Sequence, residues 1–261
     1  EQAGLAGPAV DYWHRAARRD AERSANIEAL NHFNRALDLL KELPEGLERN
    51  TLELELLLTR GSPLLAVKGY ASDDMEHNYQ RAKDLLSEQS SSVDQFRVIR
   101  GLWVVHMIRG HLVNARGLAE DLLALAHREQ IPDLLIEAHH AVGAINLFFG
   151  RFDEARIHLS TAKSLDVPDR HRSQVFFYGQ DSGITARILL ARTLWILGEL
   201  DQAETLALET IGMARALEHP FTHVFTLIFL AWIYAGARKA KKTLEFTDEA
   251  IAASTQYSFE L

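Results

Sequence analysis

The chain has 261 residues, of which 47% are hydrophobic and 25% charged, a composition typical of a folded protein with a sizeable core. Its formal net charge of −8 argues against a general nucleic-acid binder, since neutralising phosphates requires an excess of Lys and Arg. It contains no cysteine, which excludes disulfides, thiolate catalysis and cysteine-ligated zinc and fits a reducing compartment.

The first residues, 1–23, are polar and helix-like, and they show no secretory signal. The longest apolar run, residues 224–237, is too short to span a bilayer and predicts a buried helix. We therefore expect a cytoplasmic protein without a membrane segment. Its first residue is not Met, which is compatible with a fragment of a longer protein.

Apolar residues recur along the chain at spacings of three and four, and no alternating strand pattern competes, so the fold class is predicted to be all-α. Pro63 lies inside an apolar stretch and predicts a kink or a helix break. The other prolines fall where we expect connections between helices: Pro8, Pro44, Pro132, Pro168 and Pro220.

Two polar signals predict helix starts in the first half of the chain. Asp73 is followed by Glu76 three residues later, and Asp94 precedes an apolar-periodic stretch. Between them, residues 87–92 are rich in serine and predict an exposed loop.

The hexapeptide Gly-x-[Leu/Phe]-x-x-Ala occurs at residues 110–115, 150–155 and 198–203. Each copy ends one amphipathic stretch and begins the next. Glycine permits the backbone needed at the end of a helix, the large apolar residue is expected to staple the turn, and alanine allows a close helix approach. The motif predicts helix-turn-helix repeats, which encode a surface rather than a reaction centre.

This register predicts a tetratricopeptide-like right-handed superhelix, a single α-solenoid domain over residues 1–261. Equivalent alanines are 40 residues apart from Ala115 to Ala155 and 48 apart from Ala155 to Ala203. Both spacings exceed the tetratricopeptide period of about 34 residues, and a period of about 40 residues also suits HEAT or armadillo repeats. The Gly-x-[Leu/Phe]-x-x-Ala turn nevertheless favours the tetratricopeptide pattern. The longest connector is 165–183. We expect about six helix pairs, at roughly 9–43, 50–88, 94–129, 133–166, 184–218 and 221–256.

Four segments carry a family resemblance: Ala25-Asn26-Ile27-Glu28-Ala29, Lys68-Gly69-Tyr70-Ala71, Tyr178-Gly179-Gln180-Asp181 and Glu218-His219-Pro220-Phe221. With them the chain resembles the tetratricopeptide region that follows the ATPase module in large bacterial signalling proteins, many of which begin with a class III adenylate/guanylate cyclase domain. The resemblance covers nearly the whole chain. It implies a sensor or scaffold arm attached to an ATPase or a cyclase. The chain itself has no Walker motif and no cyclase-like aspartate pair.

In such a superhelix the first helix of each pair lines the concave groove. Arg97, Arg100, His140 and Arg192 could form a basic strip that binds a carboxylate or phosphate. Alternatively, the arginines pair with acidic neighbours and only shape the superhelix. The register places these candidates in the groove: Arg97, Arg100, Met107, His140, Arg192, Trp195 and Trp232.

Tyr178, Gly179, Gln180 and Asp181 lie in the one segment that repeat geometry does not require. Polar groups in a long ordered loop are often functional. The loop is equally compatible with a purely structural role, held down by residues 175–177 packing beneath it.

The twelve histidines do not predict a metal site. His219 and His223 are four residues apart, but Pro220 disfavours helical geometry at His219. The adjacent His139 and His140 diverge on a helix. No histidine cluster has carboxylates at ligand spacing.

The sequence thus predicts a non-catalytic, cofactor-free interaction or regulatory module of a signalling ATPase or cyclase. Its expected partners are a protein, a peptide or other domains of the same polypeptide, bound in the concave groove. The alternative is a small-molecule sensor for an anionic ligand or nucleotide. Neither oligomeric state nor ligand identity follows from the sequence.

Overall fold

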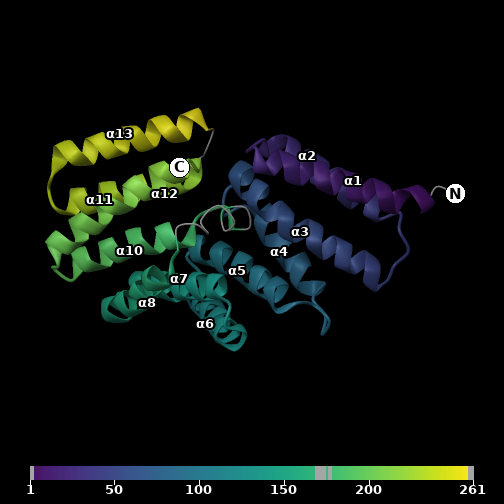
Figure 1. Cartoon of the computed structure of the whole chain (residues 1–261), viewed down its shortest axis with the longest axis horizontal. Coiled ribbons are helices and arrows are strands. Elements are labelled where there is room, and N and C mark those ends of the chain that lie inside the picture. The colour runs from purple at the N-terminus through teal and green to yellow at the C-terminus, as the bar shows by residue number, and fades with distance from the viewer. Residues whose placement is uncertain (1–2, 168–174, 176–177, 258–261) are drawn as a thin grey trace. The chain divides into compact units, whose positions relative to one another are not determined.

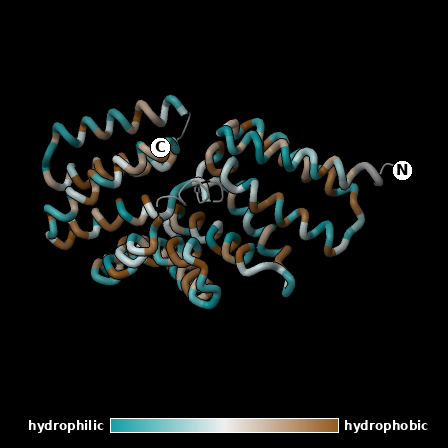
Figure 2. Tube along the Cα trace, viewed as in Figure 1, coloured by the Kyte–Doolittle hydropathy of each residue, from teal (hydrophilic) through white to brown (hydrophobic). Residues whose placement is uncertain are grey.

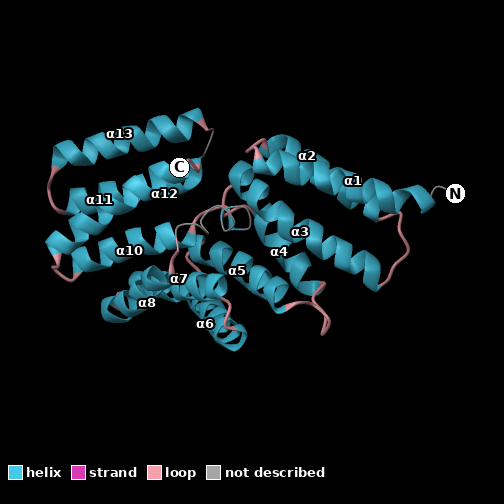
Figure 3. Cartoon of the chain, in the orientation of Figure 1, coloured by secondary structure: helices cyan, strands magenta, loops and turns pink. Residues whose placement is uncertain are grey.

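The computed structural model describes residues 3–167, 175 and 178–257, and within them every regular element is an α-helix (Figure 3). The all-α prediction is confirmed. Hydrophobic and hydrophilic residues alternate in short runs along the helices of the chain (Figure 2). The described helices are α1 (Ala3–Glu22), α2 (Asn26–Leu40), α3 (Leu47–Lys68), α4 (Asp73–Asp84), α5 (Ser92–Ile108), α6 (Leu112–Glu129), α7 (Pro132–Phe148), α8 (Phe152–Leu165), α10 (Ser182–Ile196), α11 (Leu200–Leu217), α12 (Pro220–Gly236) and α13 (Ala240–Gln256).

The chain divides into two compact units (Figure 1). The first unit comprises Glu1–Gly110 and Phe176–Gly179 and contains α1 to α5. The second comprises His111–Val175 and Gln180–Leu261 and contains α6 to α8 and α10 to α13. The unit boundary at Gly110 falls inside the third expected repeat. A single solenoid over residues 1–261 stays a prediction.

In the first unit, α1 packs against α2, α2 against α3, and α3 against α4. Ala17, Ala29 and Ala36 are completely buried where α1 and α2 meet, because only short side chains allow helices to approach closely. Further along, the ring of Tyr79 occupies the space that a Cβ at Gly61 or Gly101 would need. The small residues of the predicted register therefore mark real helix crossings.

In the second unit, α7 packs against α8, α10 against α11, and α12 against α13. The first helices of these pairs also pack on one another, α7 on α10 and α10 on α12. Leu159 fills the space beside Gly143, and the Trp195 ring fills the space beside Gly236. This stacking of first helices places α10 and α12 side by side.

The three predicted hexapeptide turns are confirmed. Gly110, Gly150 and Gly198 have φ of +75°, +74° and +88°, and the alanine five residues later is completely buried each time. The expected staple fails in the third copy, where the Leu200 side chain is 55% exposed. The turn is therefore held by backbone geometry and alanine packing, and the large apolar residue is not required.

The same turn occurs twice without glycine. Arg238 between α12 and α13 has φ +55°, and Ser24 between α1 and α2 has φ +59°. In both cases the next backbone N–H donates to a carbonyl five residues earlier, from Lys239 to Tyr234 at 3.0 Å and from Ala25 to Asp20 at 2.9 Å. Arg151 in the second predicted turn makes the equivalent bond. The glycine motif does not identify these two turns, because the residue with the left-handed backbone conformation is not glycine.

One proline prediction is wrong: Pro8 lies inside α1 and not at a connection. At Pro63 the predicted helix break does not occur, because α3 continues through this residue, and the kink stays a prediction. A proline removes one backbone hydrogen bond, and α3 is held on both sides by packing against α2 and α4. Pro132 and Pro220 are the first residues of α7 and α12, where the missing N–H has no intrahelical partner to lose. Pro168 lies outside the described residues.

The predicted helix starts near residues 73 and 94 are each capped by a serine. Ser72 Oγ accepts a hydrogen bond from Met75 N at 3.3 Å, so α4 begins at Asp73. Ser91 Oγ accepts from Asp94 N at 3.1 Å, so α5 begins at Ser92, earlier than Asp94 suggests. The serine-rich loop thus ends one residue sooner than predicted, because its last serine belongs to the helix.

None of the helices described above combines the length and the apolar composition that crossing a membrane requires.

Two alanine substitutions test the turn geometry. Gly150→Ala should lower the free energy of unfolding by about 1–2 kcal/mol, because alanine is strained at positive φ. Gly117→Ala is the matched control: Gly117 lies in the middle of α6 with open space around its Cβ position, so alanine should raise stability by about 0.5–1 kcal/mol. Urea denaturation followed by circular dichroism measures both. Equal effects of the same sign would contradict the assigned turn.

Candidate functional site

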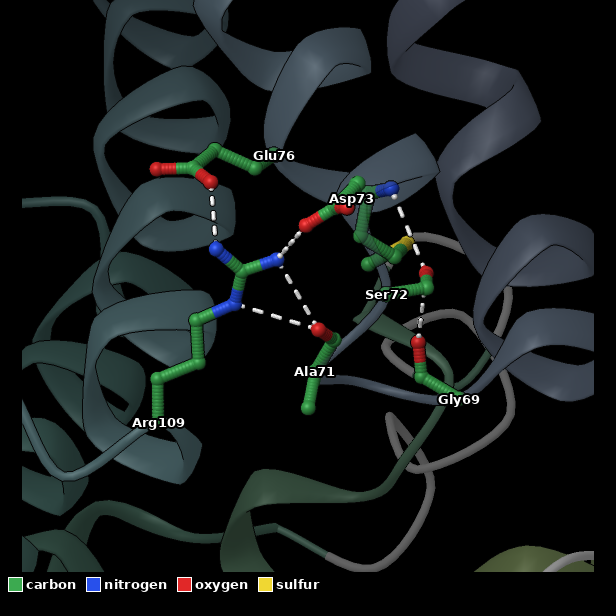
Figure 4. Close-up of polar contacts among 7 residues, drawn as sticks. Gly69, Ala71, Ser72, Asp73, Glu76 and Arg109 are labelled. Atoms are coloured by element: carbon green, nitrogen blue, oxygen red, sulfur yellow. Dashed lines mark hydrogen bonds and ion pairs between the residues drawn. The ribbon is translucent and has the colours of Figure 1, made fainter.

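Arg109 joins the end of α5 to the connection between α3 and α4 (Figure 4). Its Nε and Nη2 donate to the carbonyl oxygen of Ala71 at 3.1 and 2.9 Å. Nη2 also donates to Asp73 at 2.6 Å, and Nη1 donates to Glu76 at 2.5 Å. The guanidinium is thus occupied by partners of its own unit. It holds Ala71, the last residue of Lys68–Ala71, one of the four segments that carry the family resemblance.

The groove candidates of the first unit are Arg97, Arg100 and Met107, all on α5. Arg100 is only 3% exposed, and its guanidinium lies over the rings of Trp103 at 5.8 Å and Tyr178 at 5.2 Å. Arg97 pairs with Asp94 at 3.6 Å, as the structural alternative predicts. Met107 is half-buried. Arg100 is therefore part of the interior of this unit.

His140, the next candidate, is buried in the second unit at 2% exposure. Its Nδ1 lies 3.6 Å from an Oε of Glu137, which is itself completely buried and accepts a hydrogen bond from Ser182 Oγ. His140 is thus placed beside a buried carboxylate of its own helix.

The four loop candidates are divided between the units, with Tyr178 and Gly179 in the first and Gln180 and Asp181 in the second. All four are buried. Gly179 has φ +68°, and Leu65 occupies the space of its missing Cβ. Asp181 Oδ1 accepts from Ile184 N at 2.7 Å, which caps α10, and Asp181 N donates to Thr222 Oγ1 at 3.1 Å. These contacts favour the structural interpretation of the loop.

Arg192, Trp195 and Trp232 come together in the second unit, on the adjacent helices α10 and α12. The Arg192 guanidinium lies 4.5 Å from the centre of the Trp232 ring and 5.7 Å from that of Phe229. Trp232 is 49% exposed, and Arg192 and Trp195 are half-buried. Burial lowers the pKa of Arg192, because desolvation disfavours its charged form.

A row of aromatic side chains extends this cluster along α12. Ring centres are 6.4 Å apart from Phe221 to Phe225, 4.7 Å from Phe225 to Phe229, and 4.9 Å from Phe229 to Trp232. The spacing of four, four and three residues keeps the rings on one side of the helix. Phe225 and Phe229 lie in the run 224–237, which predicts only a buried helix, and Phe221 precedes this run in the segment Glu218–Phe221. We name the following set the aromatic face: Arg192, Trp195, Phe221, Phe225, Phe229 and Trp232.

A separate cleft of about 750 Å³ lies between α8, α10 and α11. Its α8 wall carries Arg156 and Lys163, its α11 wall carries Asp201 and Glu209, and leucines of α10 and α11 lie between them. This volume is within the range of small-molecule sites.

Three histidines meet where α6, α7 and α8 pack. His139 Nδ1 lies 3.0 Å from His158 Nδ1, and the His127 ring is 5.8 Å from that of His139. Burial, and then the charges of His158 and His127, lower the pKa of His139 from 6.5 to about 4. In the described part of the chain, no three His, Asp or Glu side chains are arranged to hold a metal ion.

His219 caps α12, with Nδ1 accepting from Thr222 N at 3.3 Å. Its φ of −99° and ψ of 112° are extended, as Pro220 predicts. Burial lowers the pKa of His219 to about 4. A neutral imidazole is needed here, because a protonated Nδ1 cannot accept the capping bond.

No family model matches the chain. It is 24% identical over 233 residues to an uncharacterized protein of Rhizobium meliloti (strain 1021), a match that covers 87% of this chain and 22% of that protein. The chain therefore spans about a fifth of the length of this relative.

Among solved structures, the chain is similar to the apo form of RapI, with a TM-score of 0.66 at 13% identity over 95% of this chain and 83% of that one. It is also similar to a Rap protein complexed with Competence and Sporulation Factor, with a TM-score of 0.61 at 13% identity over 98% of this chain and 78% of that one. A third similar structure is the Rap conjugation gene regulator of plasmid pLS20 in complex with the Phr* peptide. Its TM-score is 0.63 at 16% identity, and the match covers 95% of this chain and 74% of that one. At these identities the likeness concerns the fold, which is an all-α, tetratricopeptide-like array of helix pairs.

Arg109→Lys should lower the free energy of unfolding by about 1–3 kcal/mol, because an ammonium cannot serve Ala71, Asp73 and Glu76 together. The control is Arg15→Lys, in an exposed pair with Asp11, which should change stability by less than about 0.5 kcal/mol. Urea denaturation measures both. A neutral Arg109→Lys would show that the arginine does not hold the connection.

Acid should destabilise the chain between pH 6.5 and 4. His139 and His219 have folded pKa values near 4, below the unfolded value of 6.5, so unfolding takes up protons in this window. Their stabilising effect is complete above pH 6.5 and lost as the pH falls towards 4. Each contributes up to about a tenfold rise in the unfolding constant per pH unit.

The matched variant for this pH effect is His219→Asn, which keeps a good N-cap residue but does not titrate. Its free energy of unfolding should fall less steeply between pH 6.5 and 4 than that of the unmodified chain. Denaturant titrations at several pH values measure the slopes. Identical slopes would exclude His219 as a contributor.

Proposed function

We propose that this chain is a non-catalytic interaction module that binds a peptide or an extended segment of a partner protein on its aromatic face. The observation that carries the proposal is the half-exposed Trp232 at the end of a row of phenylalanines. On the same helix, the core-facing Leu227, Leu230 and Tyr234 are at most 1% exposed. Large aromatic side chains beside an arginine are the residue types that contribute most energy to protein interfaces.

The similar structures support a peptide as the occupant. One of these Rap proteins is complexed with Competence and Sporulation Factor, and another with the Phr* peptide. An array of helix pairs offers a continuous surface along its first helices, which suits an extended chain. In the present chain the aromatic face belongs to two such first helices, α10 and α12.

The proposal extends to a cytoplasmic signalling protein in which this region is one part. The chain spans about a fifth of its relative from Rhizobium meliloti, and its sequence resembles regions attached to ATPase and cyclase modules. A bound peptide, or a neighbouring domain in the same position, would bias such a module only by binding one of its states more tightly. In this scheme nucleotide chemistry belongs to the attached module.

A small-molecule sensor is the second candidate, and the cleft between α8, α10 and α11 favours it over the 178–181 loop. The cleft has a suitable volume, with cationic Lys163 and anionic Glu209 on opposite walls. A ligand there would have to offer both an anionic and a cationic group. Loss of ligand affinity in Lys163→Glu, with Trp232→Ala unaffected, would favour this candidate.

Trp232→Ala should weaken binding of peptides selected from a random displayed library by at least about tenfold, because truncating a hot-spot tryptophan costs about 2 kcal/mol or more. The matched control is Leu244→Ala on α13, which removes a side chain that is 62% exposed but outside the aromatic face. Fluorescence anisotropy measures both affinities. Equal affinities of the two variants would place binding elsewhere.

A further inference from the structure

Two buried hydrogen-bond donors of the aromatic face make no hydrogen bond within the described residues. They are Nη1 of Arg192 and Nε1 of Trp195. The two residues are three apart on α10, so they lie on the same side of that helix. Both groups can only donate. One side of α10 therefore carries two donors whose acceptor this part of the chain does not supply.

Arg192 differs in this respect from other arginines of the second unit. Arg156 pairs with Glu199 at 2.8 Å, Arg187 with Asp166 at 3.1 Å, and Arg215 with Glu249 at 2.8 Å. The contacts of Arg192 are the aromatic rings of Phe229 and Trp232. Burial lowers the pKa of Arg192, and desolvation is its cause. Since a guanidinium keeps its proton in proteins, the charge of Arg192 has no carboxylate partner among the described residues.

Trp232 is the group that covers this charge. Its ring lies 4.5 Å from the guanidinium, and Trp232 is nearly half exposed. Phe225 and Phe221 continue the apolar surface from this point towards the start of α12. The face thus combines one concealed cation with an apolar track that begins beside it.

We propose that the peptide bound by this face carries a glutamate or aspartate side chain that accepts hydrogen bonds from both Arg192 and Trp195. This inference rests on the proposed function and specifies the partner. A carboxylate has acceptor positions for two donors and neutralises the charge of Arg192. Apolar side chains next to the acidic residue pack along Phe225 and Phe221. Trp232 moves from the guanidinium onto the peptide.

The test begins with a random twelve-residue library displayed with its C-terminus fused to the carrier, so that no free C-terminal carboxylate is present. Peptides selected by the unmodified chain should share one acidic position flanked by aromatic or aliphatic residues. The best peptide is then synthesised with an amidated C-terminus, in a Glu form and in a Gln form. The Glu form should bind at least about tenfold more tightly, and in Arg192→Gln the two forms should bind within about twofold.

The indole N–H resonance of Trp195 gives an independent readout. The chain has four tryptophans, so its ¹H–¹⁵N spectrum holds four indole signals, and Trp195→Phe identifies the relevant one. The Glu peptide should shift this signal downfield, as expected for a new hydrogen bond to Nε1, and the Gln peptide should shift it much less. Trp103, which lies in the first unit, serves as the internal reference.

The outcomes separate the two proposals. Selected peptides that need Trp232 but bind equally well in the Glu and Gln forms would overturn the acidic partner and leave peptide binding intact. A library that yields no binding peptide would overturn both. If Arg192→Gln does not fold, the Glu and Gln peptides on the unmodified chain, with the Trp195 signal, decide the question by themselves.

Discussion

Close contact between neighbouring helices is the constraint on which the rest of this structure depends. Ala155 and Ala203 are completely buried, each five residues after a glycine with positive φ. The left-handed residue reverses the chain in the shortest distance, and the alanine allows the returning helix to lie close. Because first helices then stack on first helices, residues far apart in sequence, such as Arg192 and Trp232, become neighbours.

Much of this fold could be predicted from the sequence, because positive φ and close helix approach are requirements that glycine and alanine meet visibly. The turn at Arg238 could not be predicted, since its backbone hydrogen bonds form whatever the side chain. Pro63 misled for a related reason: tertiary packing keeps α3 continuous although one bond is lost. Local patterns thus identify turns that require glycine. They are less reliable in predicting whether a helix continues through a residue such as proline.

The candidate site was predictable only in part. Helix register identified the face that holds Arg192, Trp195 and Trp232, but it does not reveal how deeply a side chain is covered, and Arg100 and His140 proved to be interior. Hydrophobicity alone predicts Phe225 in the core, whereas it is only partly buried and packs between the partly buried Phe221 and the buried Phe229. The burial of a side chain depends on the neighbouring helix pair. That pair is distant in sequence, so a local sequence pattern carries no information about it.

The membership of Tyr178 in the first unit bears on how the protein is made. Tyr178 supplies a ring beneath the Arg100 guanidinium, and Gly179 lies against Leu65. During synthesis, α1 to α5 emerge from the ribosome well before these two residues exist. Until Tyr178 has been synthesised, the Arg100 guanidinium can pack on Trp103 but not on the Tyr178 ring. The first unit therefore completes its core only after α6 to α8 of the second have been translated, so assembly of the two units overlaps in time.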